Sequence, residues 1–412
     1  MGSTAGAREL DLVLFGATGF TGRLVAEYLV EKHPAIRWAL AGRDRQKLER
    51  VRDDLTVLDP RASALPIVVG DSHDAAAMSD VAKRARVVCT TVGPYGRYGA
   101  PLLAACAEHG THYCDLAGET PWIRAMIDEH HERAAASGAR IVPCCGFDSI
   151  PSDLGVLVLH DHLAKSGDRL AEAHLLVVKM SGGASGGTLA SMFDLAGNIG
   201  DPAVQKALED PYVLNPADGP RGPDRRDQLG PRFDRETGRW TAPFVMAAIN
   251  TRVVRRSNAL LDFAYGRDFR YDEAMSTGRG PVGAALAAGV SAGIGAFFAA
   301  AALPPTRKLL QKVLPAPGEG PSEEARRKGS FRLEIHAKSA GGRRLRGVVA
   351  GQGDPGYLAT SRMLGESALC LAQEQGDALP ARAGLLTPAS AMGMTLVSRL
   401  EKVGVSFAVE DL

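Results

Sequence analysis

The sequence predicts an α/β protein with an N-terminal doubly wound parallel sheet and a second, separate structural unit. Two observations predict the sheet: apolar strand-like runs alternate with helical patterns up to about residue 150, and three glycines at three-residue spacing follow the first of these runs. A third observation predicts the second unit, because a chain of 412 residues is too long for one ordinary hydrophobic core.

The N-terminal part is expected to contain six strands joined by short connections. The first strand leads into a helix whose apolar residues fall on one face and which stops before Pro34. The second strand precedes Asp44, which can cap the next helix. Six strands in this rhythm are what a dinucleotide-binding domain requires. The expected strands lie at 12–15, 38–41, 65–69, 86–92, 111–117 and 140–144.

After about Pro151 the alternation gives way to a middle part rich in glycine and proline. The polar stretch 215–238 has almost no large apolar residues, so we expect an exposed loop there, with disorder as an open alternative. Two strands that meet around Gly341 and Gly342 are expected to form a hairpin. Residues 361–375 are expected to form an amphipathic helix.

The segment 280–306 carries no charge and is long enough to span a bilayer. Its composition argues against insertion, because alanine and glycine dominate and prolines bracket the segment. We therefore expect a buried helix or hairpin. A lipid-facing surface element is the first alternative, and a transmembrane span is the second.

Charge, cysteine usage and motif spacing exclude several classes of function. Lys and Arg number 48 and Asp and Glu 47, so no global field attracts nucleic acid or an anionic membrane. The six cysteines lack C-x-x-C pairs and the histidines lack metal-ligand spacing, so we expect reduced cysteines and no metal site. No G-x-S-x-G elbow offers a hydrolase nucleophile. The first ten residues lack an apolar signal core, so we expect a cytoplasmic protein, with membrane association left open by 280–306.

The glycine-rich turn after the first strand is a candidate dinucleotide site. Gly16 permits the tight turn, Gly19 lets the backbone approach a pyrophosphate, and Gly22 allows the helix to pack closely on the strand. The N-terminus of the following helix attracts the anion. We therefore expect the cofactor to contact the whole turn, which comprises Gly16, Ala17, Thr18, Gly19, Phe20, Thr21 and Gly22.

The residues after the second strand favour NADPH over NADH. An acid there would bond the ribose 2′-hydroxyl, whereas an arginine would pair with the 2′-phosphate, and this chain has Arg43 with no acid before Asp44. The alternative is that Arg43 is only a solvated residue of the first helical turn. After the third strand, Asp71 could bond the adenine amino group or could equally cap the next helix.

Candidate catalytic residues follow the fourth strand at the carboxyl edge of the sheet. Thr91, Gly93 and Pro94 are expected to shape a loop against the ribose and nicotinamide. Tyr95 and Tyr98 would then stand near the hydride, as proton donors, oxyanion support or substrate walls, with core packing as the alternative.

Asp148 and Ser149 are the second choice for catalytic residues. They follow the sixth strand, so they are expected at the same edge of the sheet.

Together these motifs resemble the saccharopine dehydrogenase-like oxidoreductases, and among them most closely the mycobacterial trans-acting enoyl reductases. The resemblance implies an N-terminal Rossmann domain at 1–150, an inserted α+β domain with a mixed sheet at 151–352, and a C-terminal return segment at 353–412 that packs back on the first domain. It extends from Asp11 to the C-terminus and rests on the stretches GATGFTGRL, AGR, TTVGPYGRYG, GFDSIPSD, SGGTLASM, NTRVVRRSNALL and GDPGYLATSRMLGE.

The resemblance implies an NADPH-dependent reductase that acts on a carbon–carbon double bond of a polyketide or lipid acyl chain. Such enzymes serve a polyketide synthase that lacks its own reductase module, during assembly of phthiocerol-type cell-wall lipids. Hydride would pass to the electron-poor β-carbon, and an acid or water would protonate the α-carbon. The expected partner is a lipid-like or acyl-thioester substrate. A polyketide synthase or acyl carrier protein, a membrane surface and a second copy of the chain remain open.

Two alternatives remain at this level. A saccharopine dehydrogenase-like reductase would act on a C=N or C=O bond, and an amino-acid dicarboxylate would require converging arginines, for which Arg252, Arg255 and Arg256 are candidates. These arginines could equally bind a carrier protein's phosphopantetheine phosphate or a neighbouring carboxylate. The second alternative is a nonenzymatic, lipid-associated NADPH-binding protein.

Overall fold

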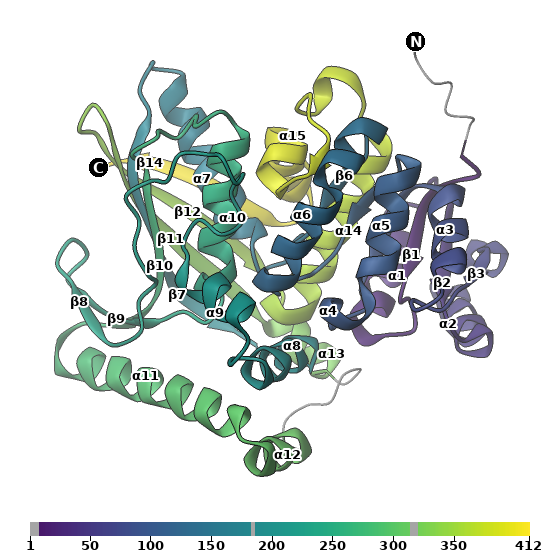
Figure 1. The fold of residues 1–412 in the computed structure, drawn as a ribbon, viewed down its shortest axis with the longest axis horizontal. Helices are drawn as coiled ribbons and strands as arrows, with labels where there is room; N and C mark the ends of the chain where they lie inside the picture. The colour runs from purple at the N-terminus through teal and green to yellow at the C-terminus, as the bar shows by residue number, and fades with distance from the viewer. Residues whose placement is uncertain (1–7, 183–185, 314–319) are drawn as a thin grey trace.

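A computed structural model shows two seven-stranded sheets that lie side by side, each with its own helices (Figure 1). The structure describes residues 8–182, 186–313 and 320–412. Sheet A lies on the right in Figure 1 and contains the N-terminal strands, whereas sheet B lies on the left.

Sheet A is entirely parallel, with the strand order β13-β6-β5-β4-β1-β2-β3. The order in which strands are added reverses between β1 and β4: β2 and β3 follow on one side of β1, and β4, β5 and β6 follow on the other. Open α/β sheets bind ligands at such a switch point. All six expected strands are confirmed, and the seventh comes from near the C-terminus. The strands are β1 (Leu10–Phe15), β2 (Trp38–Gly42), β3 (Ile67–Val69), β4 (Ala85–Thr90), β5 (His112–Cys114), β6 (Arg140–Val142) and β13 (Gly384–Leu385).

Alternate side chains of β1 build two hydrophobic cores, because neighbouring residues of a strand point to opposite faces of a sheet. Leu12 and Leu14 belong to one core, and Val13 and Phe15 belong to the other. This two-sided cover confirms the predicted doubly wound α/β architecture. The first face carries α1 (Phe20–Lys32), α2 (Arg45–Leu58) and α14 (Thr360–Gln373), and the second carries α3 (Ala75–Arg84), α5 (Ala100–His109) and α6 (Thr120–Ser137).

Sheet B is mixed, with the order β14-β12-β11-β7-β10-β9-β8. Only the β7–β10 pair is parallel, and β11 and β12 form the expected hairpin. Helix α7 (Ile150–Ala164) leaves sheet A and packs against sheet B and α10 (Ala247–Leu260). The strands are β7 (Leu170–Ser181), β8 (Arg232–Asp234), β9 (Arg239–Pro243), β10 (Arg270–Gly278), β11 (Ser330–Ser339), β12 (Arg344–Gln352) and β14 (Val405–Asp411).

The C-terminal part of the chain joins both sheets. Helix α14 packs on β1, β4 and β5, and β13 then extends sheet A beside β6. Helix α15 (Pro388–Lys402) packs on α7 and α14, and the final strand β14 pairs with β12 in sheet B. The remaining elements are α4 (Tyr95–Tyr98), α8 (Gly186–Gly197), α9 (Pro202–Glu209), α11 (Gly280–Ala302), α12 (Pro304–Val313), α13 (Glu323–Lys328) and the short turns η1 (Pro60–Ala64), η2 (Pro355–Ala359) and η3 (Gly376–Ala378).

The expectation of a buried helix or hairpin at 280–306 is wrong. Residues 280–302 of this segment form the helix α11, of which only Gly283, Ala287 and Ala301 are buried, and α12 begins at Pro304. By length and composition this helix could cross a bilayer. Apolar composition alone could not show its exposure, because burial depends on whether another element covers the helix.

Glu366 ties the C-terminal segment to the Rossmann domain. Its carboxylate accepts hydrogen bonds from the Tyr28 hydroxyl, from His33 at 2.9 Å and from the Arg399 guanidinium at 2.8 Å. The Glu366 side chain is 3 % exposed. Burial alone would raise the pKa of Glu366, but the bonds from His33 and Tyr28 and the charge of Arg399 outweigh burial and lower the pKa below its ordinary value.

We expect Glu366→Ala to lower the free energy of unfolding by about 3 kcal/mol at neutral pH, because it leaves the Arg399 charge buried without its main partner. Glu374→Ala is the matched control: Glu374 also pairs with Arg399 but is more exposed, so its loss should cost less than about 1 kcal/mol. Urea unfolding of both variants measures the difference.

The same measurement has a definite pH dependence. Because the pKa of Glu366 is lowered on folding, its contribution is present above the ordinary value of 4.5 and is lost as the pH falls through the lowered value. The gap between wild type and Glu366→Ala should therefore shrink on acidification. Equal losses of unfolding free energy in Glu366→Ala and Glu374→Ala would contradict the role of Glu366 as the main partner of Arg399.

Candidate cofactor and active site

The glycine turn between β1 and α1 has the geometry that a bound pyrophosphate requires. Gly16 has a φ of 94°, and a Cβ on Gly22 would lie 2.2 Å from the Gly16 carbonyl oxygen, so neither position accepts a side chain. Gly19 is exposed at the N-cap of α1, and no described side chain caps that helix. The first amides of α1 are therefore open to an anion.

The loop after β4 borders the same turn. The Thr91 hydroxyl donates to the Gly16 carbonyl oxygen at 3.2 Å, and a Cβ on Gly16 would lie 2.7 Å from Val92 Cγ2. Gly93 is exposed and Pro94 is half-buried just before α4. Thr91 thus contacts the glycine turn at the switch point of sheet A, and Gly93 and Pro94 follow it in the same loop.

Phe20 connects the glycine turn to the second unit. Its ring packs edge-on against Tyr357 of η2, with centroids 4.6 Å apart, and the Arg326 guanidinium lies 5.1 Å from the centroid of the Phe20 ring. Ala17 is buried beneath the turn, and Thr18 and Thr21 are half-buried. Both units therefore contribute to the surroundings of the predicted pyrophosphate site.

Arg43 lies immediately after β2 and is exposed. It has no hydrogen bond or ion pair with any residue that the structure describes, whereas Asp44 caps α2 by accepting from the Lys47 amide at 3.1 Å. Arg43 is thus free to pair with a 2′-phosphate. Asp71 accepts from the His73 amide at 2.9 Å, and it is Asp74 that caps α3. The capping alternative for Asp71 is therefore wrong.

The two candidate tyrosines of α4 lie in different surroundings. Tyr95 is 5 % exposed, and its hydroxyl donates to the Thr90 carbonyl oxygen at 3.2 Å and accepts from the Leu116 amide at 3.1 Å. Burial raises the pKa of Tyr95 well above its ordinary value. Tyr98 is half-buried beside His73, at 5.3 Å between ring centroids, and its hydroxyl bonds to no described residue. Only Tyr98 has a hydroxyl available for a ligand.

Glu119, which the sequence analysis did not select, holds α4 in place. Its carboxylate accepts from the amides of Tyr95 at 2.8 Å and Gly96 at 2.7 Å, and from the Ser191 hydroxyl of α8 at 2.9 Å. The only sequence signal was an acid just before α6, where it would be taken for the cap of α6. The second unit therefore fixes the loop that would border the nicotinamide.

Asp148 and Ser149 follow β6, which is separated from β4 by β5 in sheet A. The Ser149 hydroxyl donates to Asn250 Oδ1 at 3.0 Å, and the Asn250 amide donates to Glu273 Oε2 at 3.0 Å. Burial raises the pKa of Asp148 to about 6 and that of Glu273 to about 7. Ser149 thus belongs to a buried polar chain between the two units.

Two of the candidate substrate-binding arginines pair with carboxylates inside the protein. Arg252 pairs with Asp227, and Arg255 Nε donates to Asp224 Oδ2 at 2.6 Å. Both guanidinium groups are buried, so the neighbouring-carboxylate alternative is confirmed for them. Both aspartates come from the polar stretch 215–238, which is largely exposed and has no helix or strand before β8, so the expected exposed loop is confirmed, with these two carboxylates turned inward. The sequence could not show which buried charges that stretch neutralises.

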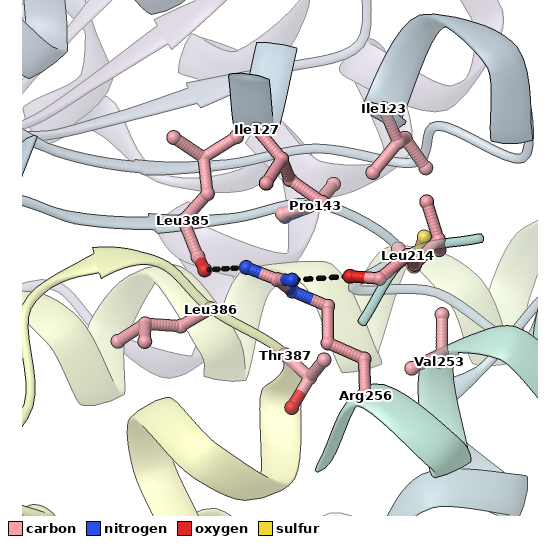
Figure 2. A pocket seen from close by; sticks show the side chains of 10 residues that line it. Ile123, Ile127, Pro143, Leu214, Val253, Arg256, Leu385, Leu386 and Thr387 are labelled. Atoms are coloured by element: carbon pink, nitrogen blue, oxygen red, sulfur yellow. Dashed lines mark hydrogen bonds between the residues drawn. The ribbon is translucent and has the colours of Figure 1, made fainter. Parts of the chain in front are cut away.

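Arg256 is also buried, but its guanidinium bonds only to backbone oxygens among the described residues. It donates to the carbonyl oxygens of Leu214 and of Leu385, the latter at 2.7 Å (Figure 2). Apart from Thr387, the labelled side chains around it, including Ile127 and Val253, are apolar, and this burial lowers the pKa of Arg256 to about 9. Arg256 therefore joins α10 to the edge strand β13 and offers no charge to a substrate.

In the described part of the chain, no three His, Cys, Asp or Glu side chains are placed to hold a metal ion. The six cysteines are all free and buried. The arrangement thus offers a candidate dinucleotide site at the β1–β4 switch point, and Tyr98 of α4 has a hydroxyl without a partner among the described residues.

Comparison with known proteins identifies relatives of the whole chain. Residues 12–142 match the family described as the saccharopine dehydrogenase NADP binding domain. A Mycobacterium tuberculosis protein, provisionally named a trans-acting enoyl reductase, is 46 % identical over 423 aligned positions that cover 99 % of each chain. A trans-acting enoyl reductase from Mycobacterium ulcerans is 44 % identical and is aligned over 97 % of each chain.

Among solved structures, the apo saccharopine dehydrogenase (L-Glu forming) from Saccharomyces cerevisiae aligns with a TM-score of 0.52. The alignment covers 97 % of this chain and 99 % of that chain at 12 % identity, which shows a shared fold.

We expect Arg43→Ala to weaken NADPH binding about 10- to 100-fold and to leave NADH binding unchanged, because only the 2′-phosphate loses a charged partner. Fluorescence titration with both cofactors measures this preference. Arg50→Ala, an exposed arginine further along α2, is the matched control and should change neither affinity. A parallel loss of NADH affinity in Arg43→Ala would contradict the assignment.

Proposed function

The chain belongs to the trans-acting enoyl reductases of the saccharopine dehydrogenase-like family and is an NADP-dependent oxidoreductase, and from this premise we propose that it reduces the carbon–carbon double bond of an enoyl thioester. We propose a polyketide or lipid acyl chain as the substrate, delivered by an acyl carrier protein or a polyketide synthase.

The observation that carries this proposal is the full-length identity to proteins named as enoyl reductases. A second observation supports it: Arg252, Arg255 and Arg256 are engaged inside the protein, so none of these three is free to bind an amino-acid dicarboxylate. The family membership also makes the nonenzymatic alternative wrong for this chain.

When bound, NADPH would supply the hydride that adds to the β-carbon of the acyl chain. The protein's own residues would bind and orient the two reactants. The glycine turn would hold the pyrophosphate at the N-terminus of α1, and Arg43 would hold the 2′-phosphate. Glu119 would keep the loop of Thr91 and Pro94 fixed, so that the acyl chain meets a preformed edge of the site.

We assign the proton that adds to the α-carbon to the Tyr98 hydroxyl. Its hydroxyl is free of bonds to the described protein, and it lies on the loop after β4, next to the switch point. A neutral tyrosine can donate this proton or stabilise the thioester oxygen as charge develops there. Tyr95 positions α4 from beneath, because both of its hydroxyl bonds are made to backbone.

The substrate class is tested by NADPH oxidation with three acceptors: a long-chain enoyl thioester, the matching 3-oxoacyl thioester, and 2-oxoglutarate mixed with lysine. We expect turnover with the enoyl thioester alone, with mass spectrometry showing its saturated product. Turnover of the 3-oxoacyl thioester alone would show that the enzyme reduces a C=O bond, and turnover of the amine mixture alone would show that it reduces a C=N bond. Either result would contradict the proposal.

Tyr98→Phe should lower kcat by about 10²- to 10⁴-fold and leave the affinity for NADPH unchanged, because it removes only the proton donor. Tyr95→Phe is the matched comparison. It should change kcat little and lower the free energy of unfolding by about 1 kcal/mol, since it removes buried hydrogen bonds.

Enoyl-thioester kinetics across pH, together with urea unfolding, separate these two roles. The fold reduction in kcat caused by Tyr98→Phe should be largest at the pH at which the wild type is most active. The assignment fails if Tyr98→Phe keeps full turnover, or if Tyr95→Phe loses activity while retaining full stability.

A further inference from the structure

The outward face of α11 is apolar along its whole length. Of its exposed side chains, Val282 is 72 % exposed and Leu286 is 53 % exposed, and the others are alanine, glycine and proline. A Cβ built on Gly289 or Gly293 would meet no atom within 4 Å. A face of this kind, with no polar side chain, is unusual on a protein surface in contact with water only.

The inward face of α11 fixes the helix flat against the body of the protein. The Thr277 hydroxyl donates to the Gly283 carbonyl oxygen at 2.9 Å, and the rings of Phe193 and Phe297 pack with centroids 5.7 Å apart. Figure 1 shows the helix running along the lower edge of the molecule, with α12 at its end. Its length is about 35 Å. The helix therefore lies along the protein surface with its apolar face directed away from the protein. It cannot cross a bilayer while these contacts are kept.

Helix α12 adds a basic and apolar surface at the end of α11. Arg307 Nε donates to the Ala301 carbonyl oxygen at 2.6 Å, which fixes α12 to α11. Lys308 and Lys312 are exposed four residues apart, next to Leu309 and Val313, which are 63 % and 77 % exposed. Neither lysine pairs with a carboxylate among the described residues.

The whole stretch 279–313 contains four cations, which are Arg279, Arg307, Lys308 and Lys312, and no Asp or Glu. The cations stand at the two ends of α11, and the uncharged face lies between them. A second copy of the chain is a poor fit, because a two-fold antiparallel contact would bring the Arg279 end of one helix to the lysine end of the other. Like charges would then meet, with no acid in the stretch to separate them.

We propose that the outer faces of α11 and α12 dock on an anionic lipid bilayer. The apolar face of α11 lies in the plane of the interface, where such helices sink about 5–10 Å into the headgroup boundary. Arg279, Lys308 and Lys312 contact the lipid phosphates. This surface is separate from the cofactor site, so the proposal does not rest on the proposed function.

The test is vesicle flotation of the purified full chain without cofactor or substrate. The probes are vesicles of phosphatidylcholine alone and vesicles in which about one-third of the lipid is phosphatidylglycerol. We expect the protein to float with the anionic vesicles and to bind the neutral vesicles at least about 25-fold more weakly, with the anionic binding falling as salt rises.

Variants locate the surface. Lys308→Gln with Lys312→Gln should weaken binding about 25-fold, since each cation near an anionic surface contributes about a five-fold factor. Leu286→Glu with Leu309→Glu should abolish flotation, because charged side chains replace the inserted residues. Lys165→Gln with Lys402→Gln is the matched control, with both lysines exposed elsewhere, and should bind like the wild type. Fluorescence titration with NADPH checks that every variant is folded.

Three results would overturn the proposal. The first is a wild type that floats with neither kind of vesicle. The second is a control that loses binding as strongly as the α12 variant. The third is a wild type that sediments as a dimer which Leu286→Glu converts to a monomer, since a second copy would then cover the face.

Discussion

Three buried guanidinium groups on one helix organise the second unit, and one of them, Arg256, joins it to sheet A. Arg252, Arg255 and Arg256 of α10 are all removed from water, and a buried cation is tolerated only when its donors find acceptors. Those acceptors come from distant segments: the polar stretch 215–238, the Tyr271 carbonyl oxygen of β10, and the Leu214 and Leu385 carbonyl oxygens. The need of these arginines for acceptors therefore holds the polar stretch against α10. The same need holds β13 at the edge of sheet A, through Leu385.

The cofactor edge of sheet A is likewise completed by the second unit. Glu119 of the Rossmann domain accepts from Ser191 of α8 while it holds the amides of α4, and Arg97 of α4 pairs with Asp194 of α8. The ring of Phe20 packs on Tyr357. A change in the position of α8 would thus be transmitted to the loop after β4. These contacts are a direct structural connection between the second unit and the loop after β4.

Much of the fold followed from local patterns, and less of the site did. The six N-terminal strands and the turn at Gly16 and Gly22 were predicted, because alternation and glycine spacing are read within short windows. Tyr95 and Tyr98 looked equivalent in the sequence, and only the Thr90 and Leu116 backbone distinguishes them. The hydrogen bonds of the Tyr95 hydroxyl depend on where β5 and α4 meet in space.

By itself the sequence determined the doubly wound sheet, the glycine turn and the position of Arg43 directly after the second strand, since each depends on residues near one another in the chain. The tertiary structure decided which polar groups are free. It neutralised Arg252 and Arg255, gave Arg43 and the Tyr98 hydroxyl no partner among residues 8–182, 186–313 and 320–412, and left most of α11 exposed. The physical reason is that burial and pairing are properties of surfaces brought together from distant segments, which composition and spacing do not specify.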